Sequence, residues 1–132
     1  NARAETVAIK PSFRDAWRQA RHCIIPSMAI YEPDWRSGKA IPTRISRADD
    51  QPMGIAGLWD QWKSPGGETV HSFMLTINAD QHPLMNLFHK PTDEKRMVVI
   101  LEPEQFDDWL QAPAARSMEF LQPFPAEGLR VG

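Results

Sequence analysis

The sequence predicts an α+β fold in which an antiparallel, barrel-like sheet carries short peripheral helices. Twelve prolines and seven glycines divide the 132 residues into short segments, which favours strands and turns over a helical bundle. Residues 69–78 place alternate side chains on two faces, as a half-buried strand does. The 42% hydrophobic content is enough for one core, so we expect a single domain over residues 1–132.

The first expected element is a helix over residues 12–21. Ser12 can cap it, with Asp15 at the third position as a variant of the capping box, and four apolar side chains fall on one face: Phe13, Ala16, Trp17 and Ala20. A buried strand is expected to follow over residues 23–31. It should end at Glu32-Pro33, because proline interrupts a central strand.

A meander of strands is expected next. Residues 41–47 and 53–59 form two extended segments, separated by a stretch at 48–52 with the composition of a hairpin turn. A Ser-Pro-Gly-Gly turn at 64–67 then leads into the strand at 69–78.

Four short elements complete the prediction. Asp80 can cap a short helix, residues 97–101 form a buried strand, and residues 114–122 form a last short helix. Pro103 opens a further helix at its first turn, with three side chains directed inward: Phe106, Trp109 and Leu110.

Composition excludes several classes of protein. The single cysteine, Cys23, permits no internal disulfide, and the four histidines lack the spacing of a zinc site, so we expect neither a metal nor a cofactor. The sequence has no apolar run of 18 residues and no signal peptide. It therefore predicts a cytoplasmic protein without a membrane partner.

Charge is divided unevenly along the chain. The formal net charge is −2, yet residues 1–47 contain nine Lys or Arg and only four Asp or Glu, whereas residues 48–132 contain six and thirteen. Because local charge decides which ligands a surface attracts, a basic half is compatible with a phosphate-bearing partner. The alternative is a charge division without functional meaning.

Seven motifs occur in the order that is typical of one known family. They are Asn1-Ala2-Arg3-Ala4-Glu5-Thr6, Arg21-His22-Cys23-Ile24-Ile25-Pro26, Tyr31-Glu32 with Trp35, Ala56-Gly57-Leu58-Trp59, Leu75-Thr76 with Asn78-Ala79, His82-Pro83-Leu84-Met85 and Arg96-Met97-Val98-Val99-Ile100-Leu101. Together they resemble the SRAP family, also called SOS response-associated peptidase or abasic-site processing protein. The resemblance extends from residue 1 to about residue 110.

This resemblance implies a DNA-damage function. Family members recognise abasic sites in single-stranded DNA and attach to them through an amino-terminal cysteine, which is exposed when the protein removes its own initiator Met. The amine and thiol of that cysteine close on the aldehyde of the abasic sugar to give a thiazolidine ring. In the family this cysteine lies well upstream of the Asn-Ala-Arg motif, so the 132-residue chain lacks it. We therefore expect autopeptidase and lyase-like activity of the complete protein and not of this chain alone.

Two partners follow from this expectation: single-stranded DNA containing abasic sites, and the amino-terminal segment that carries the cysteine.

Glu32 is the candidate catalytic acid or base. A carboxylate between an apolar strand and a proline can be held partly desolvated, which raises its pKa toward the range useful for proton transfer. The resemblance implies the same role. The alternative is a surface carboxylate in a turn.

His89 is the candidate histidine. In much of the family the histidine stands two residues before Arg-Met, where this chain has Glu94, and a longer loop would place it at His89 instead. We expect the His89 ring to reach the cleft of Glu32 and Asn1, with residues 90–95 bulging outward and Glu94 facing solvent. The competing arrangement places Glu94 in the cleft and His89 outside it.

The resemblance also implies that Asn1 is the active-site asparagine and that Arg3 contacts DNA, with Glu5 orienting Arg3. Further cations are candidates for a phosphate track, among them Arg36 and Arg44: Arg14, Arg18, Arg21, Arg36, Lys39, Arg44 and Arg47. Candidate stacking surfaces for bases are Trp35, Trp59 and Trp62. The default assignment for Trp17, Trp59 and Trp109 is the core.

Two other functions stay open at this point. A non-covalent single-stranded DNA-binding module would need the basic residues and not the chemistry. A cysteine-type peptidase acting on other proteins would need a Cys/His couple. We expect Cys23 to be a core residue, because it lies in an apolar run.

Overall fold

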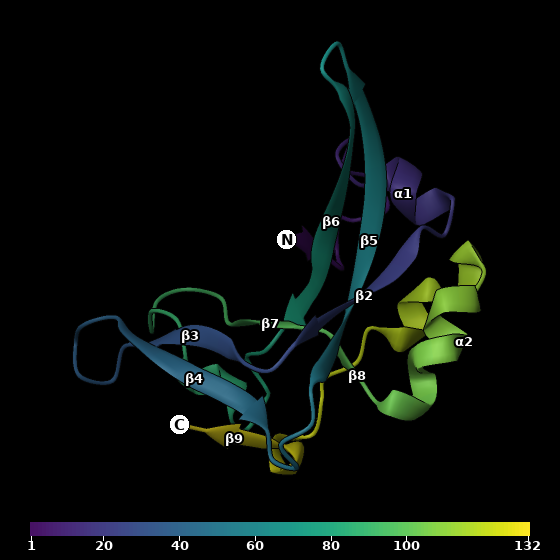
Figure 1. Cartoon of the computed structure of the whole chain (residues 1–132). Coiled ribbons are helices and arrows are strands. Elements are labelled where there is room, and N and C mark those ends of the chain that lie inside the picture. The colour runs from purple at the N-terminus through teal and green to yellow at the C-terminus, as the bar shows by residue number, and fades with distance from the viewer.

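The strands of the chain form two open sheets. The computed structural model describes residues 1–132, and Figure 1 shows a main sheet with α2 beside it and a smaller sheet at the opposite side. The main sheet has the order β1-β6-β5-β2, and β7 and β8 pair with β6 and β5 respectively. Its strands are β1 (Ala2–Arg3), β2 (His22–Ser27), β5 (Met53–Ser64), β6 (Gly67–Asn78), β7 (Arg96–Val98) and β8 (Ile100–Leu101). The predicted α+β class is confirmed.

The longest pairing is the hairpin of β5 and β6, which projects away from the body (Figure 1). Its turn lies at Ser64 and Gly67, so the expected turn and the expected strand at 69–78 are both confirmed. Near the body its side chains join the core. Toward the tip they face solvent, and Trp62 and Val70 are each 61% exposed.

The smaller sheet contains β3 (Ile30–Asp34), β4 (Ile41–Arg47) and β9 (Leu129–Val131), in that order. The prediction that 48–52 is a hairpin turn is wrong, because β4 pairs with β3 and β9 and does not pair with β5. The 48–52 segment instead carries the chain from one sheet to the other. Alternation along a strand defines its two faces but not its partner, which explains the error.

The expected buried strand at 23–31 is divided between the two sheets as β2 and β3. Pro33 does not end it, since β3 continues to Asp34 with Pro33 opposite Pro42. The carbonyl of Pro33 accepts a hydrogen bond from the His89 N–H at 2.8 Å, so the backbone polar groups at Pro33 point away from β4. Because an N–H at this position would not bond to β4, proline removes no hydrogen bond between the two strands.

The helices are shorter than expected. Helix α1 (Arg14–Arg18) begins after Phe13, and no side chain caps it, so the predicted Ser12 cap is wrong. The 3-10 turn η2 (Pro103–Gln105) leads into α2 (Phe106–Gln111), and a capping box joins Glu102 and Gln105. Trp109 is completely buried as predicted, whereas Leu110 is exposed rather than inward.

Helix α2 covers one edge of the main sheet. The Trp109 indole N–H donates a hydrogen bond to the Cys23 carbonyl at 2.9 Å, and the His22 ring stacks on the indole. The otherwise open edge of β2 is therefore protected by the helix.

The segment after β6 forms the 3-10 turn η1 (Met85–Leu87) rather than a helix capped by Asp80. His82 organises it, since its Nδ1 accepts hydrogen bonds from the backbone N–H groups of Leu84 and Met85. His82 Nε2 then donates to the Phe124 carbonyl at 2.7 Å and joins the turn to the last part of the chain.

The remaining elements are the 3-10 turns η3 (Ala114–Phe120) and η4 (Ala126–Gly128). The core is one cluster of 23 buried residues, whose largest completely buried members are Trp109, Phe88 and Ile45. No helix has the length and apolar character needed to cross a membrane.

Candidate functional site

Glu32 lies on β3 with its side chain only 17% exposed. Its pairing with Thr43 places it on the same face as Ile30 and Ile45, and Ile45 is fully buried. Burial raises the pKa of the Glu32 carboxyl, and the charge of His89 lowers it in part. The alternative of a surface carboxylate is therefore wrong.

The ring of His89 contacts this carboxylate, with 3.1 Å between His89 Nε2 and Glu32 Oε2. Our expectation that the two groups meet is confirmed, although 57 positions separate them in the chain. The backbone of His89 has a φ of +68°, in the left-handed region, and its N–H is bonded to Pro33 in the strand that carries Glu32. A short backbone link thus brings the two side chains together.

The contacts of His89 also define its tautomer. Nε2 lies 3.2 Å from the carbonyl oxygen of Arg96 as well as close to Glu32. A carbonyl oxygen only accepts hydrogen bonds, so Nε2 must carry the proton. In the neutral ring Nδ1 then has a free lone pair, which is the property needed in a proton acceptor.

Two adjacent hollows meet at this pair. A cleft of about 540 Å³ is lined by Asn1 and Glu32 together with mostly apolar side chains, including Ile25, Met74 and Val98. His89 lines a separate hollow of about 330 Å³, with Trp35 among its neighbours. Asn1 and Glu32 therefore share the cleft as expected, whereas His89 approaches it through its contact with Glu32.

Asn1 directly precedes β1, which pairs in parallel with β6. The register joins Ala2 to Leu75 and Arg3 to Thr76, and the Ala4 N–H donates to the Thr76 carbonyl. This pairing holds the chain from the second residue onward, beside the cleft that Asn1 lines.

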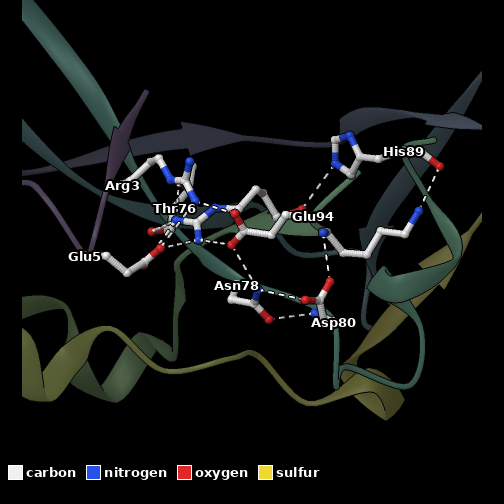
Figure 2. A network of polar contacts seen from close by, with 9 residues as sticks. Arg3, Glu5, Thr76, Asn78, Asp80, His89 and Glu94 are labelled. Atoms are coloured by element: carbon white, nitrogen blue, oxygen red, sulfur yellow. Dashed lines mark hydrogen bonds and ion pairs between the residues drawn. The ribbon is translucent and has the colours of Figure 1, made fainter. Parts of the chain in front are cut away.

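Glu94 is neither in the cleft nor free in solvent. Arg3 binds one of its oxygens, while Arg96 Nη1 and Asn78 Nδ2 each donate to the other at 2.9 Å (Figure 2). Hydrogen bonds from Asn78, then Arg96, and also from Arg3 lower the pKa of Glu94 to about 2. Glu94 is exposed as expected, and the sheet presents these donors to it at the point where the loop returns to β7.

Arg96 is the centre of this network. It donates to Glu5 at 2.6 Å and to the carbonyl and hydroxyl of Thr76, so Glu5 is bound more closely to Arg96 than to Arg3, at 3.7 Å. The sequence placed Arg96 in a motif without indicating a role. Asn78 likewise belonged to a motif, with no role indicated.

The loop at 90–95 is secured by Lys95. Its ammonium group donates to the carbonyls of His89 and Lys90 at 3.0 and 2.7 Å, and its backbone N–H donates to Asp80. Arg96 then begins β7, so the expected outward loop and the renewed strand are confirmed.

Most cations of the expected phosphate track are occupied. Arg36 binds Asp34, and Arg21 and Arg47 bind Asp60 and Asp49. Arg44 pairs with Tyr31 across the strands, on the face opposite Glu32, and donates to Ser46. The contact of Arg3, Arg36 and Arg44 with DNA stays a prediction.

The tryptophans divide into core and surface. Trp109 is in the core and Trp17 packs against it. Trp59 lies under the Arg21 guanidinium at 5.0 Å and Trp35 under the Lys90 ammonium at 5.1 Å, while Trp62 is exposed.

Cys23 has no histidine partner. The neighbouring ring of His22 is bonded to the Trp109 carbonyl and the Ser117 hydroxyl. Burial raises the pKa of the Cys23 thiol, which disfavours the reactive thiolate. These contacts argue against a Cys/His peptidase site, and no group of three or more His, Cys, Asp or Glu gathers as metal ligands would.

Known proteins resemble the chain over its whole length. The profile of the family described as "SOS response associated peptidase (SRAP)" matches residues 1–132. The abasic site processing protein YoqW of Bacillus subtilis is 34% identical over 136 residues, covering 99% of this chain and 57% of YoqW. The abasic site processing protein HMCES of Xenopus tropicalis is 25% identical, covering 93% of this chain and 42% of HMCES.

Two crystal structures share the fold. A protein from Bordetella bronchiseptica superposes with a TM-score of 0.97 at 54% identity, covering 100% of this chain and 63% of its own. A protein from Bacteroides thetaiotaomicron gives 0.86 at 30% identity, with 99% and 56% covered. The chain therefore spans less than two thirds of the length of these relatives. On the match across all its residues, the chain belongs to the SRAP family of SOS response associated peptidases.

Proposed function

We propose that this chain forms the acid-base and DNA-contacting part of a protein that processes abasic sites in single-stranded DNA. The names of the relatives YoqW and HMCES support the substrate. The observation that carries the proposal is the Glu32–His89 pair, which is partly desolvated and lies beside a cleft that Asn1 also lines. Convergence of polar groups from the beginning, the first third and the last third of the chain is typical of an active site.

The covalent step needs an amino-terminal cysteine from an upstream segment. Its amine attacks the C1′ aldehyde of the opened sugar, the resulting hydroxyl leaves as water, and the thiol adds to the C=N carbon to close a thiazolidine. The hydroxyl requires a proton to leave. Glu32 is suited to supply it, because burial raises the pKa of its carboxyl above the ordinary value and so favours the protonated form.

His89 and Asn1 would assist Glu32. With its Nε2 proton directed at the carboxylate, His89 stabilises the ionised form of Glu32 after proton transfer, and its Nδ1 can accept a proton from a sugar hydroxyl. The amide of Asn1 can both donate to an aldehyde-derived oxygen and accept from the amine. Removal of the initiator Met would use the same carboxylate as a base.

The test is covalent capture of an abasic oligonucleotide by the complete protein, read on a denaturing gel. Glu32→Gln preserves the shape of the side chain but cannot exchange a proton, so we expect the rate of capture and of Met removal to fall about 100-fold or more. Glu119→Gln, in an exposed pair with Arg116, is the matched control and should leave both rates unchanged. Full activity in the Glu32 variant would remove Glu32 from the mechanism.

The 132-residue chain alone provides a second control. It should form no covalent product, because Cys23 is not an aminothiol. A product that disappears in Cys23→Ser would contradict this assignment, and reversible binding without any capture by the complete protein would favour a simple DNA-binding module.

A further inference from the structure

Three donors from three neighbouring strands converge on the Glu94 carboxylate. Arg3 belongs to β1, Asn78 to β6 and Arg96 to β7, and β6 lies between the other two strands. The register pairs Arg3 with Thr76 and Asn78 with Arg96, so all these side chains lie on one face of the sheet. We call Arg3, Asn78 and Arg96 the anion cradle.

The backbone that carries the cradle is well anchored. Ala2, Leu75 and Met97 point to the other face of the same strands and are completely or almost completely buried. Glu94, by contrast, comes from the loop at 90–95, and its side chain is 37% exposed. The donors are therefore held by the sheet, whereas the anion between them comes from a surface connection.

The charges favour exchange of one anion for another. Arg3 and Arg96 carry two positive charges, which Glu5 and Glu94 balance. If Glu94 moved away, the cradle would have one excess positive charge, and each of its three members would lose one acceptor, although Asn78 would keep Asp80 and Arg96 would keep Glu5. A phosphodiester has one negative charge and two non-bridging oxygens, and guanidinium groups bind it as they bind a carboxylate.

We propose that Glu94 is a built-in competitor for the DNA phosphate that the family resemblance assigns to Arg3: it occupies the anion cradle until a phosphate of the bound DNA displaces it. This inference rests on the proposed function for its choice of ligand. Its consequence is that the protein binds DNA more weakly than its arginines permit, since each binding event must first break the contacts of Glu94. Glu94 thus lowers the affinity for DNA at Arg3.

The test compares Glu94→Gln with Asp93→Asn. Both variants remove one negative charge from the same loop, but Asp93 is exposed and makes no side-chain contact with the cradle. Affinity for a short single-stranded oligonucleotide with a stable abasic analogue is measured by fluorescence anisotropy. Loss of one or two exposed ion pairs should tighten binding about threefold to tenfold in Glu94→Gln, and less than about twofold in Asp93→Asn.

A second titration separates the two proposals. Inorganic phosphate is added to the wild-type chain and to both variants, while the Nε–H resonances of Arg3 and Arg96 are followed by NMR. We expect both resonances to shift together, at lower phosphate concentration in Glu94→Gln. If this occurs but no variant binds the oligonucleotide, the cradle stands and the proposed DNA function fails.

Other outcomes overturn the inference. If the affinity for the oligonucleotide rises equally in both variants, only the general charge of the loop matters. The inference about Glu94 would then fail, whereas the proposed DNA function would stand. Weaker oligonucleotide binding in Glu94→Gln at an unchanged melting temperature would mean that Glu94 orders the cradle for its ligand. If Glu94→Gln is poorly folded, the wild-type titration decides, because phosphate that shifts neither arginine resonance excludes the site.

Discussion

At the scale of single residues, His22 shows how one buried ring relates stability to pH. Its Nδ1 donates to the Trp109 carbonyl, so in the neutral ring Nε2 accepts from the Ser117 hydroxyl. Burial lowers the pKa of His22, and the hydrogen bond to Trp109 offsets this only in part. A base whose pKa is lower in the folded state stabilises the fold above its ordinary pKa of about 6.5 and loses this contribution as the pH falls.

We therefore expect the melting temperature to fall between pH 7 and pH 5 more steeply in the native chain than in His22→Gln, which cannot be protonated. His71→Gln is the control, because His71 is an exposed histidine on β6. The raised pKa of Glu32 has the opposite effect on stability as the pH falls. Because Glu32 is present in all three proteins, its effect cancels when their pH profiles are compared. Parallel pH profiles for native and His22→Gln chains would contradict the assignment.

At the scale of structural elements, the connection from η1 to β7 positions the candidate histidine. His89 occupies a left-handed backbone conformation, which a residue with a side chain adopts at some energetic cost. Lys95 compensates by donating to the carbonyls of His89 and Lys90, and Asp80 fixes the backbone of Lys95. The loop is thus secured at both ends.

Lys95→Met should release this connection without removing a core contact. We expect the nitrogen shifts of the His89 ring, which report its tautomer, to change from a single Nε2–H form to an average of both tautomers as the contact with Glu32 loosens. Lys63→Met, in the exposed hairpin pair with Glu68, is the matched control. An unchanged Nε2–H signature in Lys95→Met would show that Lys95 does not position His89.

At the scale of the whole molecule, folding brings cations of residues 1–47 into contact with carboxylates of residues 48–132. Of the nine cations within residues 1–47, five are bound to carboxylates: Arg3, Arg14, Arg21, Arg36 and Arg47. Three of their partners, Asp60, Asp49 and Glu94, come from the acidic part of the chain. Part of the positive charge of residues 1–47 is therefore neutralised by carboxylates from the rest of the chain.

This pairing limits how steeply DNA binding can depend on salt. If all nine cations contacted phosphates, the affinity for single-stranded DNA would fall with a log–log slope of about −6. The paired cations should not contribute, except Arg3, which DNA would free from Glu94. We therefore expect a log–log slope of about −4 or shallower. Anisotropy titrations across a series of NaCl concentrations measure the slope, and a value near −6 would show that the ion pairs open on binding.

The sequence by itself determined the fold class, most strand positions, the family, and the meeting of His89 with Glu32. These depend on local patterns and on motifs read in order, such as the alternation in β6 and the turn at Ser64 and Gly67. It also predicted that Asn1 and Glu32 line one cleft, because each lies on or next to a strand.

Only the tertiary structure decided the partners of β4 and the acceptor of the Arg3 side chain. Strand β4 pairs with β9, and Arg3 binds Glu94, although each pair is far apart in the chain. The exposure of Leu110 likewise depends on where α2 packs. The physical reason is that alternation and charge are properties of single segments, whereas pairing and ion contacts depend on the position of a second segment. The cradle around Glu94 exists only because β1, β6 and β7 lie side by side.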